Sequence, residues 1–134
     1  MRLFSALIAA ALIGPCIAFA NVLETIAETK TLRIGYRVDT PPFSFQGSDG
    51  KARGYSVDLC RAVADTIRRD LKLQTIAIQY ITVTAENRFE AIETGAIDLL
   101  CGATSATVSR RKTVDFSLPI FVDGAGLMIR EGLT

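Results

Sequence analysis

Hydrophobic residues recur along the chain with two different spacings, which predict strands and helices in turn. Three short segments rich in β-branched and apolar residues predict strands, at 31–36, 74–81 and 97–101. The third (Ile-Asp-Leu-Leu-Cys) is almost entirely apolar, so we expect it to be the central strand of the sheet.

Helices are predicted before the first strand and between the strands. Residues 21–29 fit a short helix with Asn21 as its N-cap, and residues 86–94 fit another that ends at Gly95. The longest predicted helix follows Ser56, which we expect to cap it. Its apolar residues recur at helical spacing and form one stripe: Cys60, Val63, Ala64, Ile67 and Leu71.

Strands that alternate with helices predict an α/β fold, with a mostly parallel sheet and helices on its faces. Residues 43–54, which enclose a glycine-rich turn, predict a small hairpin. In parallel sheets, ligands bind outside the carboxyl ends of the strands. Three segments should therefore gather at one edge of the sheet: 37–45, 82–88 and 102–110.

The C-terminal part of the chain predicts less regular structure. We expect a helical turn at 110–112 and extended pieces at 114–117, 121–123 and 127–130.

The first twenty residues differ from the rest of the chain. Arg2 is followed by an unbroken run of apolar and small residues, which is short and rich in alanine for a membrane span. The run ends in Ala18-Phe19-Ala20, a pattern typical of a secretory cleavage site. We therefore expect 1–20 to be a signal peptide that is removed. A lipid anchor at Cys16 is the less favoured alternative, because Pro15 stands where a small residue is needed.

Composition then excludes several classes of function. Lys and Arg total 15 and Asp and Glu total 14, so the chain is close to neutral and is not expected to bind nucleic acid. It contains no histidine, which excludes a Ser-His-Asp triad and a histidine-containing zinc site. The glycine-rich nucleotide motifs and the CxxC motif are also absent from the sequence. We accordingly expect no cofactor, no metal and no catalytic residue.

Each of the three segments at the predicted sheet edge carries one arginine: Arg37, Arg88 and Arg110. A guanidinium group is a planar, permanently charged fork suited to a carboxylate or phosphate. Three of them meeting at one edge would favour a small anion with more than one acidic group. Each also has an ordinary alternative: an ion pair with Asp39 for Arg37, an ion pair with Glu86 or Glu90 for Arg88, and a solvated basic run with Arg111 and Lys112 for Arg110.

The segment at 102–107 adds small and hydroxyl-bearing residues beside Arg110. Small residues allow close approach of the backbone, hydroxyls donate hydrogen bonds, and a helical turn starting near Thr107 would offer free N–H groups to an anion. An ordinary Ser/Thr loop is the alternative. Phe43 is a candidate for lining the same site, whereas we expect Phe45 to pack under the hairpin.

Two cysteines, Cys60 and Cys101, remain outside the predicted signal peptide. Export from the cytoplasm would permit a disulfide between them. The sequence equally allows two small, buried core residues, because spacing alone does not place the two Cα atoms within bonding range.

In combination, several ordered blocks of the sequence resemble one protein family. The blocks are Leu32-Arg33-Ile34-Gly35, Pro42-Phe43-Ser44-Phe45, Gly54-Tyr55-Ser56-Val57-Asp58-Leu59, Gly95-Ala96-Ile97-Asp98, and Arg110-Arg111 followed by Val114-Asp115-Phe116-Ser117. Together they resemble the bacterial periplasmic amino-acid-binding proteins of ABC importers, solute-binding protein family 3. The resemblance covers nearly all of residues 30–130.

The resemblance implies a periplasmic-binding-protein fold of type II, in which two lobes joined by hinge strands close on the ligand. On that basis residues 21–123 would form an incomplete first lobe, and residues 124–134 would begin the hinge. The second lobe would be missing, as expected for a truncated or split product, and binding would be weak. The resemblance also implies a monomer that binds a small-molecule amino acid and works with an importer permease.

Within the family, the chain is most similar to glutamate- and aspartate-binding members. That similarity implies a role for each of six residues: Arg110 for the α-carboxylate, Arg37 and Arg88 for the side-chain carboxylate, Ser105 as a hydroxyl donor, the backbone of Ala103 as an acceptor for the α-ammonium, and Thr40 in the pocket lining. Ala85 and Ala103 depart from the pattern, because those members tend to have serine at both positions.

Two other readings share this fold. A periplasmic dehydratase acting on prephenate or arogenate would need a proton donor and acceptor, and Asp39 and Glu86 are the acidic residues near the predicted crevice. A sensor or lytic-enzyme input domain would use the same lobe within a larger chain.

Overall fold

The computed structural model describes residues 21–124, 128 and 130. The predicted signal peptide lies outside these residues, as do most of the predicted hinge segment at 124–134 and half of the extended piece at 127–130.

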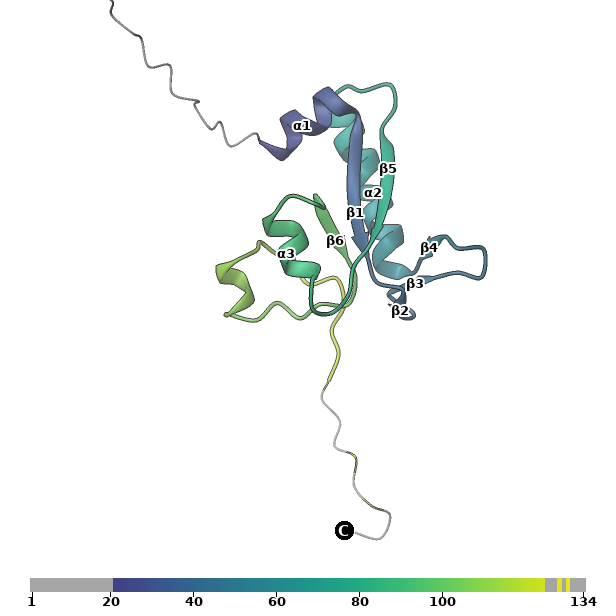
Figure 1. Cartoon of the computed structure of the whole chain (residues 1–134), viewed down its shortest axis with the longest axis vertical. Coiled ribbons are helices and arrows are strands. Elements are labelled where there is room, and N and C mark those ends of the chain that lie inside the picture. Colours follow the sequence, from purple (N-terminus) through teal and green to yellow (C-terminus); the bar gives the residue numbers. More distant parts are fainter. Residues whose placement is uncertain (1–20, 125–127, 129, 131–134) are drawn as a thin grey trace, which may run out of the picture.

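Three parallel strands form the central sheet, in the order β5-β1-β6 (Figure 1). They are β1 (Thr31–Tyr36), β5 (Ala77–Thr82) and β6 (Leu99–Cys101). In the register, Ile34 of β1 lies between Tyr80 of β5 and Leu99 of β6. The predicted parallel α/β architecture is therefore confirmed.

The expectation that the segment at 97–101 is the central strand was wrong. Within the described residues β1 is central and β6 lies at an edge. Ile97 is buried because it packs against Gly35 of β1. A Cβ atom added to Gly35 would lie only 2.4 Å from the Cδ1 atom of Ile97, so the contact is close. The apolar character of this segment thus reflects contact with the face of β1 rather than a central place in the sheet.

Three α-helices and one short 3-10 helix accompany the sheet in the described part of the chain. They are α1 (Val22–Thr29), α2 (Tyr55–Asp70), α3 (Arg88–Glu93) and η1 (Arg110–Lys112). The Oδ1 atom of Asn21 accepts a hydrogen bond from Leu23 N at 3.1 Å, so the predicted cap is confirmed. Gly95 follows α3 with φ +69°, as expected of a terminating glycine.

The predicted cap of α2 was wrong. The helix begins at Tyr55, and its N-cap is Gly54, with φ +123°. A Cβ atom on Gly54 would lie 2.4 Å from the carbonyl oxygen of Phe43, so this close approach requires glycine. Ser56 lies inside the first turn, buried, and its hydroxyl donates to the carbonyl of Gly102 at 3.4 Å.

A second, antiparallel sheet contains the predicted hairpin. Its strands are β2 (Asp39–Thr40), β3 (Ser44–Gln46) and β4 (Ala52–Arg53), in the order β2-β3-β4. Figure 1 shows it beside the carboxyl end of β1, with α2 passing behind β1 and β5. The segments at 114–117 and 121–123 form no strand within the described residues.

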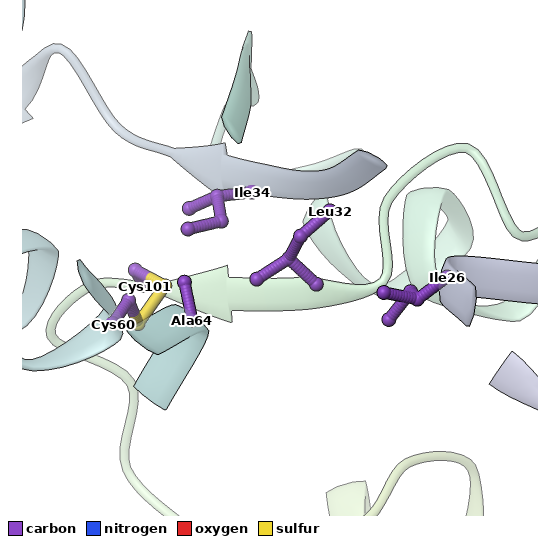
Figure 2. Close-up of a cluster of buried hydrophobic side chains, with 6 residues drawn as sticks. All are labelled: Ile26, Leu32, Ile34, Cys60, Ala64 and Cys101. Atoms are coloured by element: carbon purple, nitrogen blue, oxygen red, sulfur yellow. A yellow bond between two sulfur atoms is a disulfide. The ribbon is translucent and has the colours of Figure 1, made fainter. Parts of the chain in front are cut away.

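The core lies between the sheet and the helices α1 and α2. Figure 2 shows its buried members, which come from α1, β1, α2 and β6: Ile26, Leu32, Ile34, Cys60, Ala64 and Cys101. Ile67 and Leu71 pack against this cluster as predicted, but Val63 is 44% exposed. At 100° per residue, Val63 lies at the margin of the helix face that Cys60, Ala64 and Ile67 share.

The sulfur atoms of Cys60 and Cys101 are bonded, and their Cα atoms are 6.3 Å apart. The disulfide joins α2 to the end of β6 (Figure 2).

Within the described residues, no helix combines the length and apolar character needed to cross a membrane.

Candidate functional site

The carboxyl ends of the three parallel strands bring the predicted arginines to one edge of the sheet. Arg37 directly follows β1, Arg88 begins the helix after β5, and Arg110 begins the helical turn after β6. Burial lowers the pKa of the Arg88 guanidinium from its ordinary value, and the charges of Arg110 and Arg37 lower it further. Arg37 and Arg110 are thus each close enough to Arg88 to act on its charge.

Arg88 is a buried cation, with only 8% of its surface exposed. Its Nη1 donates to the carbonyl of Ala85, and its guanidinium lies over the ring of Phe89, 4.6 Å from the centroid. Its Nε is buried and has no hydrogen-bond acceptor. Neither Glu86 nor Glu90, the partners considered from the sequence, forms an ion pair with it among the described residues.

Glu86 affects the site from a distance instead. A hydrogen bond with Thr84 lowers the pKa of Glu86, and the charges of Arg37 and Arg88 contribute to the same shift. Its carboxylate therefore remains charged at neutral pH near Arg37 and Arg88.

Arg37 is in the ion pair that the sequence suggested as its ordinary alternative. Its Nε and Nη2 donate to the two carboxylate oxygens of Asp39, at 2.9 and 2.7 Å. This hydrogen bonding lowers the pKa of Asp39. Asp39 is exposed, so the contact between the two side chains lies at the surface of the site.

Ser44 anchors the backbone of Arg37, a role that the sequence analysis missed. The Ser44 hydroxyl accepts from Arg37 N at 2.9 Å and donates to Arg37 O at 3.0 Å, and the residue is fully buried. The sequence does carry one signal, because Ser44 stands between two aromatic residues that favour burial, and a buried hydroxyl needs a hydrogen-bond partner. Thr40, a predicted pocket residue, donates its hydroxyl to the Ser44 carbonyl at 2.8 Å.

The loop after β6 carries the remaining predicted residues. Arg110 donates from Nη1 to the carbonyl of Ser105 at 2.9 Å, and its guanidinium lies over the Phe89 ring, 5.3 Å from the centroid. Ala103 and Ser105 are exposed. The helical turn starts at Arg110 rather than near Thr107, and the Arg110 N–H donates to the Thr107 hydroxyl at 3.4 Å, which reduces its availability to an anion.

The two phenylalanines of the hairpin make no ring contact with Arg37, Arg88 or Arg110 among the described residues. Phe43 packs edge-on against Tyr55 and Phe121. Phe45 is half-buried and lines a hollow of about 480 Å³ together with Arg53 and Arg61. Within the described residues no group of three or more histidine, cysteine or acidic side chains is arranged to hold a metal ion.

This geometry can bind acidic groups. Among residues 21–124, Arg88 is a buried cation with no carboxylate partner, and Arg110 contacts a backbone carbonyl and a ring. Arg37 is held by an exposed carboxylate. Such forks suit carboxylates, which accept two parallel hydrogen bonds.

Comparison with known proteins places the chain in a family. The family model for bacterial extracellular solute-binding proteins, family 3, matches residues 32–134. An L-glutamate/L-aspartate-binding protein of Pseudomonas aeruginosa strain PAO1 is 36% identical over 132 residues, which cover 96% of this chain and 44% of the relative. A glutamate/aspartate import solute-binding protein of Escherichia coli K12 is 31% identical, covering 86% of this chain and 38% of the relative.

Among solved structures, the arginine-bound form of domain 1 from TmArgBP, determined as its Phe57Trp mutant, has a TM-score of 0.63 and is 28% identical. The match covers 74% of this chain and 71% of that domain. The chain spans less than half the length of the two curated relatives, both of which are named as binding proteins rather than enzymes. The chain belongs to the bacterial extracellular solute-binding proteins of family 3.

Proposed function

We propose that this chain carries a binding site for an acidic amino acid and serves as the solute-binding component of an amino-acid ABC importer. The observation that carries the proposal is Arg88, a buried guanidinium with an unsatisfied Nε beside two further cations. An isolated buried charge is costly unless it is paired. A ligand carboxylate would supply that pair.

A ligand with two carboxylates fits the set better than a ligand with one. Arg88 and Arg110 carry no carboxylate in the described structure, and Arg37 holds one that is exposed. The names of the two curated relatives support glutamate or aspartate. Thr40, the Ala103 backbone and Ser105 are proposed to complete the site around the three arginines.

The assignment of roles follows the resemblance to glutamate- and aspartate-binding members. Arg110 is proposed to bind the α-carboxylate, and Arg37 and Arg88 the side-chain carboxylate. Ser105 would contribute its hydroxyl, which is free to do so because the Arg110 contact uses only its carbonyl.

The proposed setting is the periplasm, with the permease of the importer as partner. Family membership supports it, and so does the signal-like pattern at 1–20. The dehydratase alternative is not favoured, because the two curated relatives are named as binding proteins.

The proposal is tested by calorimetric titration of the chain with L-glutamate, L-aspartate and L-glutamine. We expect weak, roughly millimolar binding, near −4 kcal/mol, with both acidic amino acids preferred to glutamine. Arg88→Met should abolish this preference, whereas Arg69→Met, at an exposed position on α2, should leave it unchanged. Equal binding of glutamate and glutamine by the unaltered chain would contradict the proposal.

A further inference from the structure

Phe89 is the point at which two of the three cations meet. It is half-buried and is the second residue of α3. The Cζ atoms of Arg88 and Arg110 lie 4.6 and 5.3 Å from the centroid of its ring. Both distances are within the roughly 6 Å over which an aromatic ring attracts a guanidinium group.

This arrangement differs from the other cation–ring contacts in the described residues. Tyr80 and Phe116 each lie under a single cation, Arg61 and Arg111 respectively. Arg61 also hydrogen-bonds Asp58 through its side chain, so a carboxylate offsets its charge. Phe89 instead faces two guanidinium groups of the proposed binding site, and neither has a carboxylate in the described structure.

Two guanidinium groups held close together repel each other, so they separate unless another group attracts both. The charge of Arg110 acts on Arg88 strongly enough to contribute to the lowered pKa of the latter. The fixed hydrogen bonds of the two side chains are few: one to the Ala85 carbonyl and one to the Ser105 carbonyl. The ring supplies the remaining attraction.

A ring can do this without using the hydrogen bonds that a ligand needs. A guanidinium presents its flat face to an aromatic ring and its N–H groups at its edges. A hydrogen-bonding partner in the place of Phe89 would occupy those edges. The ring leaves them available to carboxylate oxygens.

We propose that Phe89 is a positioning residue, which holds the guanidinium groups of Arg88 and Arg110 at the separation that a ligand with two carboxylates requires. This inference rests on the proposed function for its ligand. It predicts that Phe89 affects selectivity more than general affinity, because a ligand with one carboxylate does not depend on the spacing of two cations.

The experiment lowers the electron density on the face of the ring while retaining its shape. Phe89 is replaced in the full chain by mono-, di- and trifluorophenylalanine, which weaken a cation–ring attraction stepwise, and by leucine, which removes the ring. The same series at Phe116 is the matched control, because that ring also lies under an arginine, Arg111, which is not among the three clustered arginines.

The first readout is affinity for L-glutamate and L-glutamine. We expect affinity for glutamate to fall stepwise with fluorination at Phe89, reaching about tenfold for Phe89→Leu, with less than a threefold change for glutamine. A tenfold change corresponds to about 1.4 kcal/mol. The series at Phe116 should change neither affinity. Equal affinity across the Phe89 series would overturn the proposal.

The second readout needs no ligand and separates this inference from the proposed function. In the ligand-free chain, the NMR signals of the Arg88 and Arg110 side chains should lose their ring-current shifts in Phe89→Leu. Phe89→Tyr, which keeps the ring, should restore them. If the unaltered chain binds no amino acid while these shifts behave as expected, the proposed function fails, whereas the contact of Phe89 with both guanidinium groups stands. Unchanged shifts in Phe89→Leu would overturn the positioning role.

Discussion

Asp39 binds Arg37 through both of its carboxylate oxygens, so an internal carboxylate occupies the position that we propose for a ligand carboxylate on this arginine. Asp39 is 61% exposed, and solvent screens an exposed ion pair so that it contributes little to stability. Displacing Asp39 should therefore cost little, and in the proposed site Asp39 would be a weak internal competitor of the ligand.

Removing this competitor should strengthen binding of acidic amino acids. We expect Asp39→Asn to raise affinity for L-glutamate by up to about fivefold. Calorimetric titration checks this, with Asp49→Asn as control because Asp49 pairs with Arg53 instead. Weaker binding by Asp39→Asn would show that Asp39 orients Arg37 rather than competing for it.

The ion pair between Arg33 and Asp98 should be important for stability. Asp98 accepts from Arg33 N at 2.8 Å and from Arg33 Nε at 3.1 Å, and its side chain is only 4% exposed. Asp98→Asn should lower the free energy of unfolding by about 2 kcal/mol, since it weakens charge-assisted hydrogen bonds. Urea unfolding measures the change. Asp65→Asn, at an exposed ion pair on α2, should have no measurable effect.

The disulfide between Cys60 and Cys101 should also stabilise the chain. It links residues 41 apart in the sequence. The loop-entropy model assigns about 4 kcal/mol to a loop of this size, a value that strain or residual structure reduces. We expect reduction, or the variant Cys60→Ala/Cys101→Ala, to lower the melting temperature markedly. A melting temperature unchanged by reductant would contradict this expectation.

Stability should fall on acidification. The pKa values of Asp39, Asp49 and Glu86 are lowered in the folded chain, by hydrogen bonds with Arg37, Arg53 and Thr84 respectively. Carboxyls with a lowered folded-state pKa contribute stability above their unfolded pKa, near 4, and this contribution is lost as pH falls through the folded-state values. The free energy of unfolding should therefore be level from about pH 7 to 5 and decline below about pH 4.

The variant Asp49→Asn provides the check on this explanation. It removes one of the three carboxyls, so its stability should decline less steeply with acid than that of the unaltered chain. Identical slopes for both proteins would assign the acid response to other groups.

The predictions from sequence succeeded where local patterns determine structure. The Asn21 cap, the terminating Gly95 and the parallel order of strands and helices follow from short-range chemistry and connection rules. Because parallel strands place their carboxyl ends together, the gathering of Arg37, Arg88 and Arg110 could also be predicted.

Predictions failed where tertiary contacts decide. Ser56 has the right chemistry for a helix cap, but the close approach of Gly54 to Phe43 starts the helix earlier. Ile97 is apolar because it packs on Gly35, which strand patterns do not reveal. The flanking aromatic residues indicate that Ser44 is buried but do not identify Arg37 as its partner, and the role of Phe89 depends on two cations at once, one of them 21 residues away in the sequence.

The most direct test of the central claim is to follow the arginine side-chain NMR signals of the chain while L-glutamate is added. If Arg37, Arg88 and Arg110 bind one ligand together, their signals should show saturable shifts with one shared dissociation constant. Arg68 and Arg69 on α2 should show none. Saturable shifts confined to arginines outside the cluster, or no saturable shift at any arginine, would contradict the central claim.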